Sequence, residues 1–202
     1  MIAIIDYGVG NLRSVQKAFE INGYETLITN DIEIINKSSG VILPGVGAFG
    51  QAMNELVKTG LDRAVHENIK SGKPFLGICL GMQLLFSLSE EFGMTKGLDI
   101  ISGKVKKFTG KLKIPHMGWN KIEFNQDCPI LKDVPPGSYM YFVHSYYVVP
   151  DNPSYIGATT EYGVKFTSLI WHDNVFACQF HPEKSQDIGL NIIKNFGSIC
   201  LS

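Results

Sequence analysis

The sequence lacks any apolar run that approaches the roughly 18 residues needed for a membrane-spanning helix. The apolar run over residues 2–5 ends at Asp6 and has no basic lead, so it does not fit a secretory signal peptide. Repeats, low-complexity tracts and flexible linkers are also missing. With 45% hydrophobic and 18% charged residues, the chain can build a sizeable core, and we expect one domain over residues 1–202.

An excess of charge of either sign is also absent, because the formal net charge is −1. We therefore expect neither a nucleic acid nor an anionic membrane as partner, since each would favour a strongly basic surface. The one local group of lysines is expected to be a solvated basic face, formed by Lys104, Lys106, Lys107, Lys111 and Lys113.

The four cysteines form no C-x-x-C pair and have no zinc-finger spacing with the five histidines. The sequence contains no Walker loop and no obvious phosphate-binding domain. We therefore expect no metal and no cofactor. A reduced, cytoplasmic location is the default expectation for such a chain.

Up to about residue 95, short apolar strands alternate with segments of helical spacing. The expected strands cover residues 2–5, 24–28, 41–43 and 73–78. The expected helices cover residues 12–19, 48–58, 61–69 and 79–88. This alternation is typical of βαβ units, so it predicts an α/β fold with a mainly parallel sheet flanked by helices.

After about residue 100 the sequence is richer in strand patterns and turns. The expected strands cover residues 139–143, 146–149, 155–160, 165–171 and 174–180. A last helix is expected over residues 187–200, because Ile188, Ile192 and Phe196 recur at helical spacing. The second half of the domain is therefore expected to be β-rich.

The sharpest local pattern is Gly77-Ile-Cys79-Leu-Gly81, where an apolar strand runs into an apolar helix. The two glycines allow a tight strand-to-helix turn and leave room for a substrate beside the central side chain. A cysteine at the start of a helix also faces the positive end of the helix dipole, which favours its thiolate. Cys79 is therefore the candidate nucleophile, and the alternative is a small buried core residue. The other three cysteines lack this setting and are interpreted as core residues.

A thiol nucleophile usually works with an imidazole that a third group orients. His181 and Glu183 follow the expected strand over residues 174–180, with Pro182 between them. Pro182 favours extended geometry at His181, and residues i and i+2 of an extended segment point to the same side. Glu183 is therefore expected to orient the ring; the alternative is a surface histidine beside an acid. His66 is expected to be solvated, and the remaining three histidines are expected to be structural or to support the site.

Gly45, Gly47 and Gly50 match the G-x-G-x-x-G pattern between an expected strand and a helix. A dinucleotide site is disfavoured, because Pro44 precedes the pattern and no acidic residue ends a following strand about 20 positions on. We favour a backbone N–H near Val46 or Gly47 that binds an oxyanion, as acyl transfer requires. A plain turn into the helix is the remaining alternative.

Taken together, these residues resemble the class I (triad) glutamine amidotransferases over the whole chain. The signature blocks of that family correspond to residues 77–83 and 181–183. Further ordered blocks cover residues 6–12, 44–47, 115–120, 142–146 and 181–185. The resemblance implies a three-layer, flavodoxin-like α/β fold and an enzyme that releases ammonia from glutamine.

The resemblance also implies a role for each site residue. Cys79 would form a γ-glutamyl thioester, while His181 moves protons and Glu183 orients it. The oxyanion would be held by the backbone of Val46 and Gly47 and by the N–H of Leu80. The residues implied in glutamine binding are Gly45, Gln83, Ser145 and Tyr146. The residues implied at a partner interface and its gate are Trp119, Asn120, Tyr141 and Lys184.

The chain has no credible acceptor site of its own, and free ammonia is mostly protonated and non-nucleophilic at neutral pH. We therefore expect the ammonia to pass to another chain. The branch of the family that the blocks resemble most acts in histidine biosynthesis, as a heterodimer with a (β/α)8-barrel cyclase that takes ammonia through a tunnel.

Three alternatives remain open. The first is an amidotransferase subunit of another pathway, such as pyridoxal phosphate or aminodeoxychorismate synthesis, which the contexts at residues 118–120 and 184–185 disfavour. The second is a non-catalytic binding module, which the intact Cys79, His181 and Glu183 disfavour. The third is a cysteine peptidase or a related thiol hydrolase on the same sheet.

Overall fold

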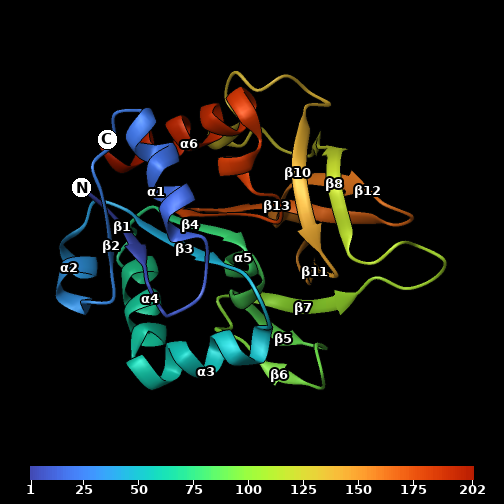
Figure 1. Ribbon diagram of the computed structural model, residues 1–202, viewed down its shortest axis with the longest axis horizontal. Coiled ribbons are helices and arrows are strands. Elements are labelled where there is room, and N and C mark those ends of the chain that lie inside the picture. Colours follow the sequence, from blue (N-terminus) through green and yellow to red (C-terminus); the bar gives the residue numbers. More distant parts are fainter.

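The computed structural model describes residues 1–202 as one sheet of twelve strands and a separate two-stranded ribbon (Figure 1). In the large sheet the order is β2-β1-β3-β4-β14-β13-β11-β7-β5-β6, and β12 pairs with both β13 and β9. The strands are β1 (Ile2–Ile5), β2 (Thr26–Thr29), β3 (Val41–Gly45), β4 (Phe75–Cys79), β5 (Phe86–Ser89), β6 (Thr95–Lys96), β7 (Ile101–Lys107), β8 (His116–Lys121), β9 (Glu123–Phe124), β10 (Tyr139–His144), β11 (Tyr146–Pro150), β12 (Ile156–Glu161), β13 (Lys165–His172) and β14 (Val175–Cys178). The α-helices are α1 (Leu12–Ile21), α2 (Ile32–Lys37), α3 (Phe49–Thr59), α4 (Leu61–Lys70), α5 (Leu80–Leu84) and α6 (Gln186–Cys200).

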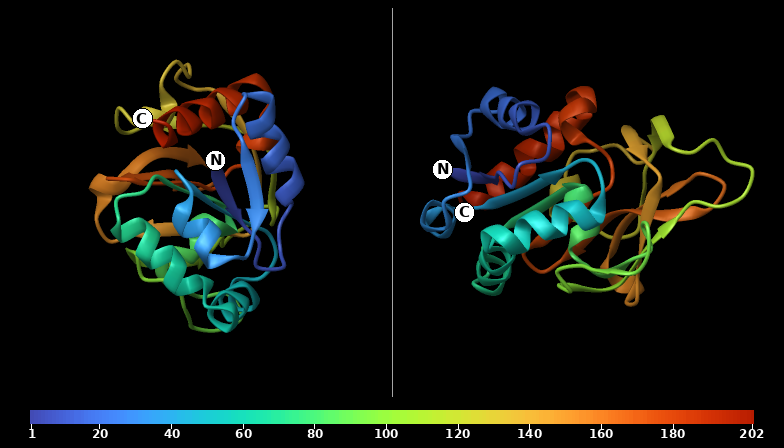
Figure 2. Two further views of the ribbon diagram at one scale, coloured as in Figure 1. Left: turned by 90° about the vertical axis from the view of Figure 1, so that its left-hand side faces the viewer. Right: turned by 60° about the horizontal axis from the view of Figure 1, so that its bottom comes forward.

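The strands β2, β1, β3, β4 and β14 run parallel to one another. A parallel sheet needs cover on both faces, and β1 shows how its side chains divide between them. Ile2 and Ile4 belong to one buried cluster with residues of α1 and α6, whereas Ala3 and Ile5 belong to another with residues of α3 and α4. Figures 1 and 2 show the two pairs of helices on opposite faces of the sheet. The three-layer α/β expectation is confirmed.

The second half is β-rich, as expected, and most of its strand pairs are antiparallel. β8 and β10 pair only with each other and form a ribbon separate from the large sheet. In this ribbon His116 lies opposite His144, and Trp119 lies opposite Tyr141. Figure 2 shows the antiparallel strands and the ribbon of this half at the end of the molecule farthest from both termini, whereas α6 of the same half lies against the parallel sheet. The ribbon therefore projects beyond the parallel sheet at the edge where β3 and β4 end.

The expected helix over residues 79–88 is wrong in length, because α5 ends at Leu84 and β5 begins at Phe86. The carbonyl of Leu84 accepts from the N–H of Leu98, and that of Leu85 accepts from Ile100 and Ile101. These long-range bonds replace the next helical turn. Residues distant in sequence therefore end the helix, and its apolar periodicity gave no sign of this.

One other expectation fails, and six further elements are not predicted at all. The strand expected over residues 174–180 ends at Cys178, so Phe180 and His181 lie beyond the sheet. The periodicity does not predict α2, β5, β6, β7, β8 or β9. In β7 the buried residues Ile101, Gly103 and Val105 alternate with exposed polar ones, so the strand has only a short apolar signal.

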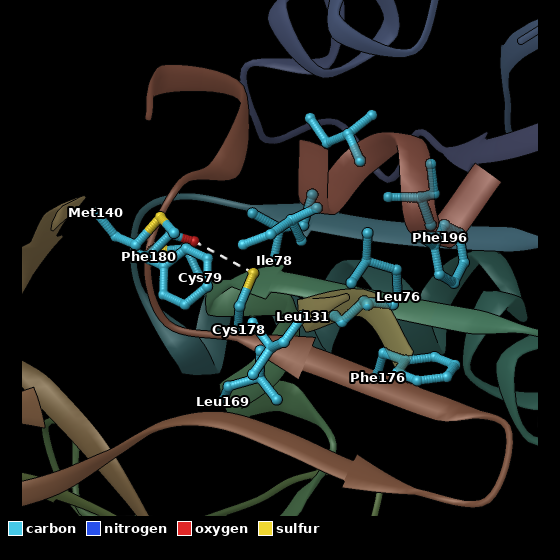
Figure 3. Packing of buried hydrophobic residues seen from close by; sticks show 14 of the residues in the cluster. Leu76, Ile78, Cys79, Leu131, Met140, Leu169, Phe176, Cys178, Phe180 and Phe196 are labelled. Atoms are coloured by element: carbon cyan, nitrogen blue, oxygen red, sulfur yellow. Dashed lines mark hydrogen bonds between the residues drawn. The ribbon is translucent and has the colours of Figure 1, made fainter. Parts of the chain in front are cut away.

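None of the helices is both long enough and apolar enough to cross a membrane. All four cysteines are free and buried. Figure 3 shows Cys178 among apolar core residues, where its thiol donates to the carbonyl of Phe180 at 3.4 Å. Burial raises the pKa of Cys128 and of Cys200 to about 12, as expected for core thiols.

Candidate active site

The corner between β4 and α5 holds Cys79 in a backbone conformation that residues other than glycine rarely adopt. Its φ is 55° and its ψ is −109°. Such strain persists only where the surrounding structure enforces it, and it is typical of nucleophile elbows at the end of a strand. Cys79 is therefore held at the carboxyl edge of the parallel sheet, directly before the first N–H groups of α5.

The two flanking glycines are required by close packing. A Cβ on Gly81 would lie 1.8 Å from the carbonyl oxygen of Leu43 in β3. A Cβ on Gly77 would lie 3.0 Å from the carbonyl oxygen of Gly81. The helix can turn back this tightly onto β3 and β4 only because both positions lack a side chain.

His181 and Glu183 form a pair, with the imidazole Nδ1 2.8 Å from the carboxylate Oε1 and with the two side chains only 3% and 1% exposed. The expected extended segment is only half right. His181 is extended, at φ −100° and ψ 96°, but residues Pro182–Lys184 form a 3-10 turn. The turn is held at its base, where the N–H of His181 donates to the carbonyl of Tyr141 at 2.9 Å. The contact therefore comes from a tight turn beyond the strand.

The pKa of His181 reflects opposing effects. Burial lowers it, but the interactions with Cys79 and with Glu183 are together stronger and raise it from 6.5 to about 10. Nδ1 faces Glu183, and the buried Nε2 makes no hydrogen bond of its own. The ring nitrogen left for the sulfur is therefore Nε2. An imidazolium between a sulfur and a carboxylate is the arrangement that activates a cysteine nucleophile.

A cavity of about 520 Å³ opens over Cys79 and His181. Eight residues expected in the site line it: Val46, Gly47, Cys79, Leu80, Gln83, Ser145, Tyr146 and His181. The cavity is lined in addition by Glu91, Phe92, Lys107, Ile114, Pro115, Val143 and His144. The nucleophile follows β4 and the imidazole follows β14, the parallel neighbour of β4, so both lie at the carboxyl edge of the parallel sheet. Lys107 and Tyr146 line the cavity from the antiparallel pair β7 and β11.

Two charged residues of the lining are not identified by the sequence patterns. Glu91 follows β5, and its carboxylate accepts from the N–H of Phe49 at the start of α3. Lys107 ends β7 opposite Tyr146 and is exposed, as expected for the lysine face, but it also lines the cavity. Glu91 adds to the effect of burial in raising the pKa of Tyr146. One acidic and one basic residue among the lining residues suit a zwitterionic ligand.

Gly45 is the one expected substrate-binding residue that does not line the cavity. A Cβ at this position would lie 2.3 Å from the hydroxyl of Tyr7, which donates to the carbonyl of Pro44 at 2.9 Å. The structure thus places Gly45 beneath the site, where it makes room for Tyr7. Val46 is 41% exposed and Gly47 has a φ of 94°, so the backbone beyond Gly45 is open to the cavity.

Gln83 is buried, and its side-chain nitrogen donates to two protein acceptors. These are the carbonyl of Tyr146 at 3.1 Å and the side-chain oxygen of Gln179 at 2.9 Å. Its amide oxygen is therefore the group available to a ligand. Gln179 in turn donates to the sulfur of Cys79 at 3.7 Å. No motif in the sequence identifies Gln179.

The four residues expected at a partner interface lie outside the cavity lining. The Trp119 and Tyr141 rings meet edge to face with centroids 5.9 Å apart, and the Lys184 Nζ lies 6.0 Å from the Tyr141 ring. Trp119 is 46% exposed. Asn120 is turned inward, because its side chain donates to the carbonyl of Glu161 at 2.9 Å. Trp119, Tyr141 and Lys184 therefore form one surface group. Trp119 and Tyr141 belong to the ribbon, and Lys184 belongs to the 3-10 turn that follows His181.

Among the other histidines, His66 is exposed, as expected. His172 stacks on Tyr155 with ring centroids 4.0 Å apart. His116 and His144 are buried and bonded to each other at 2.9 Å. His144 also lines the cavity, so it supports the site directly.

Comparison with known proteins places this chain among proteins of one family. The family model described as glutamine amidotransferase class-I matches residues 3–199. A relative from Syntrophotalea carbinolica, named imidazole glycerol phosphate synthase subunit HisH, is 52% identical over 98% of this chain and 100% of its own. A relative of the same name from Methanocaldococcus jannaschii is 53% identical over 97% of this chain and 98% of its own.

Solved structures share the fold. A putative GMP synthase subunit from Thermoplasma acidophilum superposes with a TM-score of 0.74 at 22% identity, covering 99% of this chain and 93% of that one. The structure of PurLQS from Thermotoga maritima gives a TM-score of 0.72 at 21% identity, covering 99% and 96%. At these identities the likeness concerns the fold alone.

Proposed function

The chain belongs to the class-I glutamine amidotransferase family, and from that premise we propose that it is the glutamine-hydrolysing subunit of an imidazole glycerol phosphate synthase in histidine biosynthesis. The observation that carries the proposal is the full-length identity of about half to relatives of that name. The 520 Å³ cavity supports it, because a strained cysteine and a histidine–carboxylate pair line or adjoin the same space. We further propose that residues 1–202 form a single glutaminase domain.

In the proposed reaction, the Cys79 thiolate attacks the side-chain amide carbon of glutamine and forms a tetrahedral oxyanion. The intermediate collapses as the His181 imidazolium protonates the departing nitrogen, so ammonia leaves and a γ-glutamyl thioester remains. Neutral His181 then takes a proton from water as the water attacks the thioester. Glutamate and the thiolate are released, and the imidazolium is restored. Glu183 holds the ring so that Nε2 faces the sulfur in both steps.

The proposed oxyanion site combines the N–H of Leu80 with the backbone of Val46 and Gly47. Leu80 is the first residue of α5, and the first N–H groups of a helix have no partner within it. The open backbone around Gly47 leaves its peptide free to turn an N–H toward the oxyanion. If a partner must fix this peptide, the isolated chain will lack one donor, which typically costs about 10²–10³ in turnover.

Glutamine is a zwitterion, and the charges around the cavity fit it. We propose that Glu91 accepts from its α-ammonium group and that Lys107 pairs with its α-carboxylate. Ser145 and Tyr146 line the same cavity, and Gln83 offers its amide oxygen. Gly45 contributes indirectly, because it allows Tyr7 to support the strand that carries Val46.

The proposed partner is a (β/α)8-barrel cyclase in a heterodimer, with no cofactor in this chain and no nucleic acid or membrane involved. The relatives are named as a subunit of a synthase, which supports assembly with a second chain. We propose that the group of Trp119, Tyr141 and Lys184 faces this partner and gates the ammonia path, with Asn120 behind it. Four free cysteines are compatible with a cytoplasmic location.

The test is to purify the chain with its candidate cyclase and measure glutamate release with and without the nucleotide substrate of the cyclase. We expect fast release only in the loaded complex. Cys79→Ala should abolish glutamine-dependent synthesis while ammonia-dependent synthesis by the same complex continues. Loss of both activities would show that Cys79 is structural.

Two further assays separate the alternatives. Stoichiometric labelling of Cys79 by diazo-oxo-norleucine is expected in the complex, and its absence would favour a non-catalytic module. Hydrolysis of peptides without hydrolysis of glutamine would favour a thiol hydrolase. Recovery of a synthase from another pathway, in place of the cyclase, would favour a different amidotransferase subunit.

A further inference from the structure

Gln179 is fully buried, at 0% exposure, one residue beyond the end of β14. Its backbone N–H donates to the carbonyl of Ser168 at 2.9 Å, which fixes the main chain at this point. Its side chain spans the gap between Cys79 and Gln83, with the amide nitrogen 3.7 Å from the sulfur and the amide oxygen 2.9 Å from the Gln83 nitrogen. The mechanism above gives this residue no role, although it contacts the reacting sulfur.

The orientation of the Gln179 amide is fixed by its neighbours. The carbonyl of Tyr146 can only accept hydrogen bonds, so the side-chain group of Gln83 that faces it must be the NH2 group. The same NH2 group faces Gln179, which must therefore present its oxygen there. Only the NH2 group of Gln179 is then left for Cys79. One carbonyl thus determines that an N–H points at the sulfur.

A second set of side-chain hydrogen bonds also holds the Tyr146 carbonyl in place. His144 Nδ1 lies 2.8 Å from the Tyr146 oxygen and must be the donor, and in the neutral ring its Nε2 then accepts from His116 Nδ1 at 2.9 Å. His116 Nε2 then accepts from Asn120 at 3.2 Å. This series of hydrogen bonds requires both imidazole rings to be neutral. Burial favours that state, because it lowers the pKa of His116 to about 4 and is the main cause that lowers the pKa of His144 to about 3.

We propose that Gln179 stabilises the thiolate of Cys79 by donating an amide N–H to it, in an orientation set by the Tyr146 carbonyl through Gln83. The proposal deepens the proposed function and rests on Cys79 being its nucleophile. A neutral amide suits this position, because it donates to the anion without competing with His181 for the transferred proton. A carboxylate of the same shape would place a negative charge against the sulfur.

The proposed bond acts most strongly when the sulfur is charged. It favours the thiolate before attack, and it favours the thiolate again as the leaving group when water cleaves the thioester. The N–H therefore complements His181, which interacts with the same sulfur through its imidazole. Removal of the donor should lower the fraction of thiolate at a given pH without removing the general acid.

The experiment measures alkylation of Cys79 by iodoacetamide as a function of pH, by mass spectrometry of its peptide, in the full chain without glutamine. Gln179→Met removes the donor with similar volume, and Gln179→Glu replaces it with a carboxylate. We expect the midpoint of the alkylation profile to move to higher pH in both, by about one unit or more, equivalent to tenfold in the thiolate ratio. The shift should be larger for Gln179→Glu.

Gln16→Met is the matched control. Gln16 is also a buried glutamine, 8% exposed, and its side chain donates to the carbonyl of Thr26; it does not line the cavity. Its replacement should leave the midpoint unchanged. The buried Cys128 and Cys200 have pKa values raised to about 12, so they should not react over the range measured.

An unchanged midpoint in folded Gln179→Met would overturn the proposal. The proposal also fails if Gln16→Met moves the midpoint equally, because the effect would then be general loosening. The uncharged variant keeps the test valid if Gln179→Glu does not fold. Because alkylation needs no glutamine, the two proposals can fail separately. A shifted midpoint in a chain whose loaded complex with the cyclase cannot hydrolyse glutamine would overturn the proposed function and would still support the hydrogen bond from Gln179 to Cys79.

Discussion

The two halves of the molecule contribute to one cavity by different physical means. The parallel half places Cys79 through local backbone geometry, with a strained residue between two glycines that packing requires. The second half of the chain places His181 beyond β14, the parallel neighbour of β4, through contacts over long sequence separations, such as the bond from its N–H to Tyr141 in β10. The first means depends on the space available to a few backbone atoms. The second depends on charge and hydrogen bonding, so the two halves should fail differently when perturbed.

The largest effect is expected at the corner of the parallel half. Gly81→Ala places a Cβ 1.8 Å from the Leu43 carbonyl, a backbone atom that cannot move without disturbing β3. We expect a loss of more than about 3 kcal/mol in the free energy of unfolding, measured by urea denaturation. Gly50→Ala in α3 is the control, because its nearest neighbour would be 3.8 Å away. A Gly81→Ala protein as stable as the control would contradict the packing argument.

In the β-rich half the corresponding change should affect turnover and leave the fold intact. Glu183→Gln keeps the shape of the side chain but removes the charge that orients His181 and supports its positive form. We expect kcat of glutamine hydrolysis in the complex to fall by about 10²–10³-fold. Asp173→Asn is the control, since it alters an exposed histidine–acid pair with a separation of 3.4 Å. Equal losses in both variants would remove the special role of Glu183.

The pH dependence of stability should also come from the β-rich half. The pKa of His181 rises from 6.5 to about 10 on folding, so the folded protein holds this proton more tightly than the unfolded chain does. The resulting stabilisation is fully present below pH 6.5 and is lost as the pH rises through about 10. We expect the free energy of unfolding, measured by urea titration, to fall across this interval. His181→Asn should weaken this pH dependence of the free energy of unfolding. An unaltered pH dependence would mean that other groups cause it.

The smallest effect is expected at the rim. Lys107→Met removes the charge proposed to pair with the α-carboxylate of glutamine, but the residue is exposed and its interaction is screened by water. We expect KM for glutamine to rise about two- to fivefold while kcat is kept. Lys104→Met, on the same strand but outside the cavity lining, should change neither constant. A fall in kcat alone would mean that Lys107 acts on the chemical step.

The expectations from the sequence failed where long-range contacts determine the local structure. The pairing of His181 with Glu183 was expected on the basis of an extended segment, whereas a 3-10 turn produces it. The helix expected to reach residue 88 ends at Leu84, because residues 98–101 bond to its last carbonyls. A role of Gly45 in substrate binding stays a prediction, and the structure adds a packing role against Tyr7 that the sequence does not indicate. In each case the structure depends on a contact from elsewhere in the chain.

The sequence by itself determined the alternation of strands and helices in the first half and the strand-to-helix corner at Cys79. Both depend on periodicity and on glycines a few residues apart, and such short-range properties are legible in a single chain. Only the tertiary structure decided that Glu91 and Lys107 line the cavity and that Gln179 contacts the sulfur of Cys79. Gln179 meets Cys79 from 100 positions away in sequence. The side chains of Gln179, Glu91 and Lys107 acquire their place from the pairing of strands and the closure of loops, which leaves no local pattern to read.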